Sequence, residues 1–207
     1  MTVADMPLAH SKLAGVVLAA GGSRRLGQPK QLLMWQGEPL VRRAVQTSLS
    51  LCGAGVTVVT GAFADDVAQA LHGCPVSVVN NPDWQAGMAT SLQAASRSLT
   101  APTIEGVLIT LCDQPLLSVE NLACLLNVWQ TAPDRPIASS YGNVTGVPAI
   151  FPRTLFPMLS ELSGDAGARL VLANSSDVIS VPMPNAAFDI DTKADLEQLL
   201  SGDFGGS

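Results

Sequence analysis

The sequence is poor in charged residues and in histidine. Charged side chains make up 14% of its 207 residues and apolar ones 47%, and there are 2 histidines. So little charge on an apolar chain leaves little room for disorder, and the length suits one folded domain. The formal charge of −6 disfavours nucleic acid and anionic membranes as partners, because both bind clustered Lys and Arg.

Paired cysteines are also missing. None of the cysteines forms a C-x-x-C pair, and with so few histidines a structural zinc site is not expected. His10 falls in a predicted leader and His72 at the end of a predicted helix, so no Ser–His–Asp arrangement is expected either. The cysteines lie in or beside apolar stretches, as reduced packing residues of a cytosolic protein do. They are Cys52, Cys74, Cys112 and Cys124.

Long apolar runs are absent. None approaches the roughly 20 residues that span a bilayer. The N-terminus carries Asp5 and no basic cluster, unlike a signal peptide. We therefore predict a cytoplasmic protein without membrane contact. Residues 1–12 are predicted as a flexible leader, 13–201 as a single domain and 202–207 as a flexible tail.

Between leader and tail, apolar runs of strand length alternate with helical patterns. The expected strands are residues 14–20, 56–60, 76–80, 107–111, 137–140, 147–151 and 178–181. The expected helices are residues 39–51, 64–71, 88–99, 119–129, 153–162, 166–173 and 193–200. The early strands are apolar at every position, as in a sheet covered by helices on both faces. This order predicts an α/β fold with a doubly wound, mostly parallel, Rossmann-like sheet, whose ligands bind at the carboxyl ends of its strands.

The strongest functional signal follows the first strand, where residues 18–30 read L-A-A-G-G-S-R-R-L-G-Q-P-K. Glycines at a strand end free backbone N–H groups for an anion, and Arg24, Arg25 and Lys30 follow in the same loop. A solvated basic turn is the plainer interpretation, but glycines and cations together at the ligand-binding edge favour a phosphate. The loop lacks both G-x-x-x-x-G-K-[ST] and G-x-G-x-x-G, which argues against a P-loop ATPase and an ordinary NAD fold.

Carboxylates stand in two places that suit a hard cation, which prefers oxygen ligands. Asp113 follows an apolar strand and is not needed as a helix cap, because Ser118 can cap the next helix by itself. In the run F-D-I-D-T near the C-terminus, alternation puts Asp189 and Asp191 on one face of a short strand. That pair suits either a metal or a solvated edge.

Two further segments have ordinary structural interpretations. Residues 80–92 form a turn and a helix start, whose free N–H groups could meet a ribose or a phosphate. In the run G-D-A-G-A-R, Asp165 can cap the following helix. Arg169 then lies in the first turns, where the helix dipole disfavours a cation, which hints that it reaches for an acceptor phosphate.

With these motifs in this order, the chain resembles the molybdenum cofactor cytidylyltransferase family of MobA-like NTP transferases over most of residues 13–201. The first loop fits L-A-A-G-x-S-x-R-x-G-x-x-K, and the resemblance implies that Arg25 and Lys30 are catalytic together with Asp113. It implies Mg²⁺, with Mn²⁺ as the alternative, on Asp113, Asp189 and Asp191. The implied nucleotide-binding residues are Leu18, Ala19, Ala20, Gly21, Gly22, Ser23, Gly27, Gly87 and Ser91. The implied acceptor-binding residues are Gly146, Pro148, Asp165 and Arg169.

The resemblance also implies a reaction. Ala20 makes the loop A-A-G, which in that family goes with CTP, whereas the guanylyl-transferring relatives carry A-G-G. The expected acceptor is the molybdopterin molybdenum cofactor, whose cytosine dinucleotide would serve a molybdenum hydroxylase as partner. Three alternatives stay open: GTP as donor or another acceptor such as a sugar phosphate, an oxidoreductase that reuses the fold, and a cofactor-delivery protein.

Overall fold

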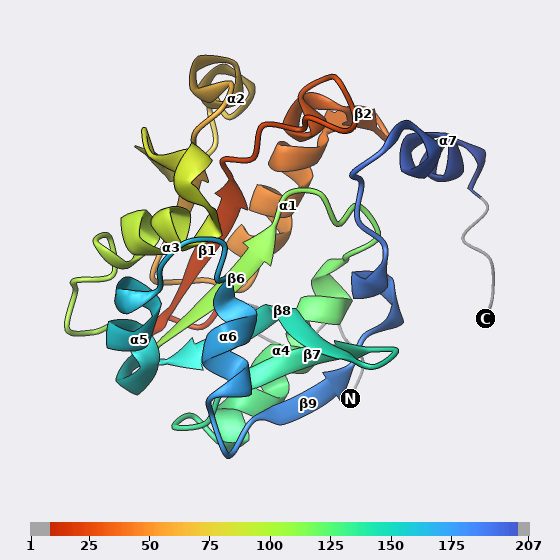
Figure 1. The fold of residues 1–207 in the computed structure, drawn as a ribbon. Helices are drawn as coiled ribbons and strands as arrows, with labels where there is room; N and C mark the ends of the chain where they lie inside the picture. The colour runs from red at the N-terminus through yellow and green to blue at the C-terminus, as the bar shows by residue number, and fades with distance from the viewer. Residues whose placement is uncertain (1–8, 203–207) are drawn as a thin grey trace.

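The computed structural model describes residues 9–202, which form a seven-stranded main sheet with helices on both faces and a two-stranded hairpin (Figure 1). The strands are β1 (Leu13–Ala19), β2 (Met34–Trp35), β3 (Glu38–Pro39), β4 (Val56–Thr60), β5 (Ser77–Asn80), β6 (Gly106–Leu111), β7 (Ile137–Tyr141), β8 (Val144–Pro152) and β9 (Ile179–Pro182). The helices are α1 (Leu40–Leu49), α2 (Ala64–Ala70), α3 (Met88–Ser96), α4 (Val119–Thr131), α5 (Phe156–Glu161), α6 (Ala168–Ala173) and α7 (Lys193–Ser201). Short 3-10 helices are η2 (Lys30–Leu32), η3 (Trp84–Ala86), η4 (Arg153–Leu155) and η5 (Pro184–Ala187).

The main sheet has the strand order β5-β4-β1-β6-β8-β7-β9. β5, β4, β1 and β6 run parallel to one another, β7 runs parallel to β9, and β8 is antiparallel to both β6 and β7. The predicted doubly wound, mostly parallel α/β sheet is therefore confirmed. The seven predicted strands all occur, with ends that differ by at most a few residues.

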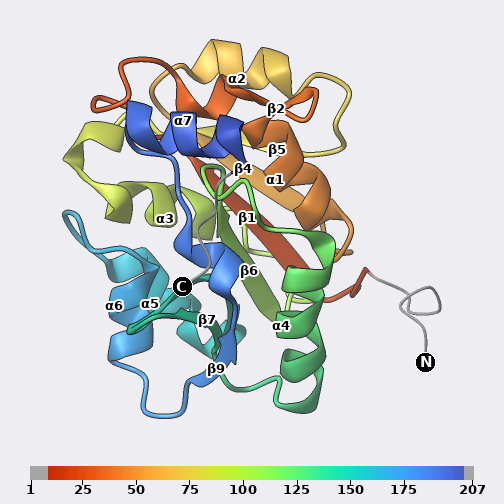
Figure 2. The same cartoon turned by 90° about the vertical axis from the view of Figure 1, so that its right-hand side faces the viewer.

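The apolar strands are explained by two cores, one on each face of the sheet. In β1, Val16 and Leu18 pack with α3, α5 and α6, whereas Leu13, Val17 and Ala19 pack on the other face with α1, α2 and α4. A strand that alternates between two buried faces has no solvent side, so every position is apolar. Figure 2 shows the sheet between these two layers.

The chain order creates a switch point between β1 and β6. After β1 the chain adds β4 and β5 on one side, then crosses to β6 on the other side of β1. The loops that follow β1 and β6 therefore leave the sheet next to each other, which is where ligands bind in open α/β sheets. The segment before α7 returns to the same place, because the N–H of Ile190 donates to the carbonyl oxygen of Asp113 at 3.0 Å.

The expected cap by Ser118 was confirmed, and two local features differ from the prediction. Ser118 caps α4 and Thr192 caps α7, each in a capping box. The β2–β3 hairpin was not predicted, and residues 188–191, expected as a short strand, belong to no strand. Most of the predicted leader and tail, residues 1–8 and 203–207, lies outside the described residues. Within the leader, the N–H of His10 donates to the carbonyl oxygen of Leu51 at 2.8 Å.

Candidate active site

The loop after β1 is fixed from inside by a residue that sequence reasoning missed. Gln31 is fully buried, and its amide Nε2 donates to the carbonyl oxygens of Ala19 at 2.9 Å and Gly21 at 2.7 Å. Across the loop, Ser23 Oγ accepts the backbone N–H of Lys30 at 3.1 Å. These bonds tie the end of the loop to its beginning, so Lys30 is held close to the carboxyl end of β1.

The cations of this loop contact the acids predicted as metal ligands. Lys30 Nζ lies 2.5 Å from Oδ2 of Asp113 and 2.8 Å from Oδ1 of Asp191. Arg25 Nη2 lies 2.6 Å from Oδ2 of Asp191. Burial alone would lower the pKa of Lys30, but the two carboxylates raise it above its ordinary value, so the ammonium stays charged. The structure thus brings the three predicted catalytic residues into one network.

The acids form a compact cluster of their own. Asp113, Asp189 and Asp191 each present a carboxylate oxygen, and these oxygens lie within 4.8 Å of one another. Burial, and then the charges of Asp113 and Asp191, raise the pKa of Asp189. Oδ1 of Asp113 is buried and has no hydrogen-bond partner. An orphaned buried oxygen among close like charges fits a hard divalent cation, which takes oxygen ligands.

Ile190 explains how the last two acids reach this place. Its side chain is fully buried in a small core with Leu26, Leu40 and Leu199. Because residue 190 points inward, its two acidic neighbours flank the anchor and stand at the cluster. Asp189 and Asp191 therefore face the same side, as predicted. The burial of Ile190 produces this arrangement, and strand pairing does not.

A cavity of about 450 Å³ opens beside this network. It is lined by most of the predicted nucleotide-binding residues and by Lys30 and Asp113, whereas Ser23 and Gly27 stand outside the lining. The predicted residues in the lining are Leu18, Ala19, Ala20, Gly21, Gly22, Gly87 and Ser91. Trp84 and Asp165 line it as well; Asp165 had been assigned to the acceptor side. The cavity therefore joins the phosphate-type loop to the start of α3.

Gly87 permits a close approach that shapes the far end of the cavity. Its φ of +112° favours glycine, and a Cβ there would lie 2.2 Å from the carbonyl oxygen of Gly164. The same carbonyl accepts the N–H of Ala89 at 3.2 Å. Ser91 is held by Asn81, whose Nδ2 donates to its Oγ at 3.0 Å. The glycine thus lets the 164–167 segment pack onto the first turn of α3.

Three of the predicted acceptor residues belong to β8 and α6, where Gly146 and Pro148 lie in β8 and Arg169 of α6 lies beside Gly146. A Cβ on Gly146 would lie 3.2 Å from the hydroxyl of Tyr141 and 3.4 Å from Cγ of Arg169, so these groups surround β8 at this point. Pro148 follows in β8 after a cis peptide bond. Burial raises the pKa of Tyr141; Arg169 opposes this and Asp189 adds to it. Tyr141, which the sequence did not single out, therefore lies close enough to Arg169, Asp189 and Asp113 for their charges to act on its hydroxyl.

A switch point that carries a basic glycine loop facing clustered carboxylates is the architecture of a nucleotidyltransferase. The MobA-like NTP transferase domain matches residues 15–178 of the chain. The chain therefore belongs to this family, as the sequence motifs predicted. Within residues 9–202, no helix has the length and apolar character that crossing a membrane requires.

Relatives of similar length carry several different names. Nicotine blue oxidoreductase of Paenarthrobacter nicotinovorans is 34% identical over 91% of this chain and 96% of its own. Purine catabolism protein PucB of Bacillus subtilis is 31% identical over 90% of this chain and 95% of its own. Molybdenum cofactor cytidylyltransferase of Escherichia coli is 25% identical over 87% of this chain and 91% of its own.

Among solved structures, Rv0371c of Mycobacterium tuberculosis is similar, with a TM-score of 0.80 and 28% identity over 92% of this chain and 98% of that one. A manganese complex of Rv0371c gives a TM-score of 0.75 at 26% identity, over the same shares of the two chains. These likenesses support the fold and the family.

Proposed function

We propose that this protein transfers CMP from CTP to a phosphorylated acceptor, the molybdopterin molybdenum cofactor, and releases pyrophosphate. An acceptor phosphate oxygen bonds to the α-phosphorus, the bond from that phosphorus to the bridging oxygen breaks, and pyrophosphate leaves with the electron pair. No protein nucleophile is required, because such transfers depend on positioning and charge neutralisation. The observation that carries the proposal is the contact of Lys30 with Asp113, which joins the anion-binding loop to the carboxylate cluster.

The residues of the site divide the work. Lys30 and Arg25 exchange their contacts with Asp191 for phosphate oxygens and stabilise the charge that grows on pyrophosphate. Ser91 and the 18–22 backbone bind the nucleoside and its phosphates in the cavity. Mg²⁺ or Mn²⁺ on Asp113, Asp189 and Asp191 would offset repulsion between donor and acceptor phosphates.

The acceptor side is proposed from proximity and chemistry. Arg169, with Gly146 and Pro148 of β8, would receive the acceptor next to the acid cluster, and Asp165 would border both substrates. The choice of CTP is supported by Ala20 in the loop and by the name of the Escherichia coli relative. We place the protein in the cytoplasm, with a molybdenum hydroxylase as the recipient of the product.

Two assays test this function. Thermal-shift titration with CTP, GTP, ATP and UTP, with and without Mg²⁺, should give a metal-dependent rise for CTP, because a ligand stabilises the state it binds. Pyrophosphate release should then require molybdopterin cofactor among a panel of phosphorylated acceptors. A rise in melting temperature with GTP alone would overturn the assignment of CTP as the donor. Release with a sugar phosphate and none with the cofactor would overturn the acceptor.

A second candidate function follows from the 34% identical relative named nicotine blue oxidoreductase. An oxidoreductase of this fold would hold a flavin or nicotinamide in the same cavity. The absorption spectrum of the purified protein, and titration with NADH and NADPH, distinguish the two. Bound redox cofactor together with absence of pyrophosphate release would favour the oxidoreductase.

A further inference from the structure

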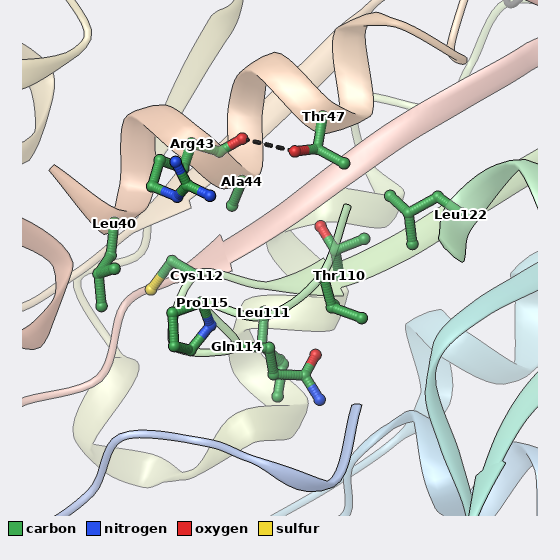
Figure 3. A pocket seen from close by; sticks show the side chains of 11 residues that line it. Leu40, Arg43, Ala44, Thr47, Thr110, Leu111, Cys112, Gln114, Pro115 and Leu122 are labelled. Carbon is green, nitrogen blue, oxygen red and sulfur yellow. Dashed lines mark hydrogen bonds between the residues drawn. The ribbon is translucent and has the colours of Figure 1, made fainter. Parts of the chain in front are cut away.

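Two adjoining cavities lie between α1 and the loop that carries Asp113, and Figure 3 shows the residues that line the inner one. The inner one measures about 20 Å³, room for a single water molecule. The outer one measures about 420 Å³. They share Arg43 and Thr47 of α1 and Pro115 and Leu117 of the loop, so they form one hollow with a narrow inner end. No part of the proposed reaction uses it.

Arg43 is the charged residue common to both cavities. Its Nε is buried without a hydrogen-bond partner, and its guanidinium makes no hydrogen bond or ion pair with any residue between 9 and 202. Its neighbour Arg42, in contrast, donates from Nη1 to the carbonyl oxygens of Ala70 at 3.2 Å and His72 at 3.3 Å. A partly buried guanidinium without an acceptor is costly, and an oxyanion would satisfy it.

Gln114 supplies a second unsatisfied group at the inner end. The residue is 7% exposed, and its Nε2 donates to the carbonyl oxygen of Ala186 at 2.9 Å. Its Oε1 is buried without a donor. This amide is turned toward Val147 and Ala186 and away from Arg43 (Figure 3), so Arg43 is the group that the anion satisfies.

The outer rim also carries an acid. Glu120 lines the outer cavity and is fully exposed, and a hydrogen bond with Ser118 lowers the pKa of its carboxyl. Its charge therefore faces solvent at the mouth of the hollow, and water screens it there. Inside the hollow, Arg43 is the charged residue, so a bound ligand should be an anion. The anion must also be compact, because it has to pass Glu120 at the rim to contact Arg43.

We propose that this hollow is a second binding site, for a compact oxyanion of the phosphate type, with Arg43 as its main ligand. The site is also linked to the catalytic loop. Cys112 and Gln114 line the inner cavity and flank Asp113 in the chain, and Cys112 lines the large cavity as well. An anion here fixes the segment that positions Asp113, so its binding and donor binding change each other's affinity.

The test must separate this site from the loop after β1, which also attracts anions. An Arg24→Ala/Arg25→Ala/Lys30→Ala background removes the three loop cations and keeps the hollow. In this background, calorimetric titration with inorganic phosphate should still show binding. Arg43→Gln added to it should weaken binding about tenfold or more, since a charge-assisted contact is lost. Arg97→Gln, which removes an exposed arginine of the α3 end, is the matched control and should leave binding unchanged.

Parallel titrations with pyrophosphate and with acetate identify the anion. Stronger binding of pyrophosphate would mark the reaction product as the ligand, and binding of acetate alone would overturn the phosphate-type assignment. Equal phosphate affinity with and without Arg43→Gln, or no binding in the background, would overturn the site.

A fluorescence measurement keeps the proposal testable if Arg43→Gln does not fold. Trp35 lines the outer cavity, whereas Trp84 lines the large one. Phosphate should change the emission of the Arg24→Ala/Arg25→Ala/Lys30→Ala protein. Trp35→Phe should abolish that change and Trp84→Phe should not. The reverse pattern would place the phosphate in the large cavity and refute the second site.

Discussion

Lys30 Nζ lies 2.5 Å from Oδ2 of Asp113 although 83 positions separate the two residues in the chain. Their side chains are only 13% and 11% exposed. The pair joins the loop after β1 to the loop after β6 across the switch point. Bonds in so little water are stronger than those on the surface, so the pair sets the spacing between the anion-binding and acidic halves of the site.

Lys30→Ala should fold and lose most transferase activity. Removing one preorganised contact with a developing charge costs on the order of 3 kcal/mol of barrier, or about a hundredfold in rate. Pyrophosphate release with CTP and acceptor measures the loss, and circular dichroism checks the fold. Lys12→Ala, which removes an exposed ion pair with Glu105, is the control and should keep its rate. Near-normal turnover in Lys30→Ala would refute the assignment.

The cysteines should differ sharply in reactivity. Burial raises the pKa of Cys52 to about 12 and raises that of Cys112 as well, whereas Cys124 is exposed. The thiolate is the reactive form, and its fraction falls as the pKa rises above the pH. Iodoacetamide at about pH 8 should therefore label Cys124 in the native protein and spare the two buried thiols. Mass spectrometry identifies the labelled cysteines. Denatured protein, in which all cysteines should be labelled, is the control. Equal native labelling of Cys52 and Cys124 would contradict the burial.

The fold could be predicted because the signals that define it are local. The central strands β1, β4 and β6 are largely apolar runs, and burial of both faces of the sheet keeps those runs continuous. The β2–β3 hairpin lacks such a run: each strand has two residues, and Gln36 and Gly37 turn with positive φ. Pairing so short carries too little side-chain pattern to be recognised in the sequence.

The site was predictable only in part, for a similar reason. Charged residues in motifs such as Lys30 and Asp113 were found because their position at strand ends gives them a chemical meaning. Gln31, Tyr141 and Arg43 were missed because their roles depend on burial and on distant partners. A glutamine that binds two carbonyl oxygens looks the same in the sequence as one in solvent. The signal that could have found Gln31 is its place directly after the basic loop.

Gly87→Ala should destabilise the protein strongly. A methyl group there would meet the carbonyl oxygen of Gly164 at 2.2 Å in a backbone conformation with φ +112°. Strain and overpacking together should cost about 2–4 kcal/mol. Urea unfolding measures this loss of stability. Gly142→Ala is the matched control: its φ is +54° and nothing lies within 4 Å of the new Cβ, so only the left-handed conformation costs, about 1 kcal/mol. Equal losses of unfolding free energy in both variants would show that the contact with the 164–167 segment does not contribute to stability.

Asp113 and Asp191 should contribute unequally to metal binding. Both oxygens of Asp191 already pair with cations, Oδ1 with Lys30 and Oδ2 with Arg25, whereas Oδ1 of Asp113 is buried and unpartnered. A divalent ion gains more from the orphaned oxygen than from oxygens that are already neutralised. Asp113→Asn should therefore weaken Mn²⁺ binding more than Asp191→Asn does, by about tenfold or more.

The measurement is calorimetric titration with Mn²⁺ in the absence of nucleotide, so it does not depend on turnover. In titrations with CTP and no metal, Asp191→Asn should instead tighten binding, because Arg25 and Lys30 no longer exchange a carboxylate contact for phosphate oxygens. Asp177→Asn, which alters an exposed acid near Arg135, is the matched control and should change neither affinity. If Asp191→Asn abolished Mn²⁺ binding and Asp113→Asn left it intact, the metal would be held at the Arg25 end of the cluster. The orphaned oxygen of Asp113 would then serve another ligand.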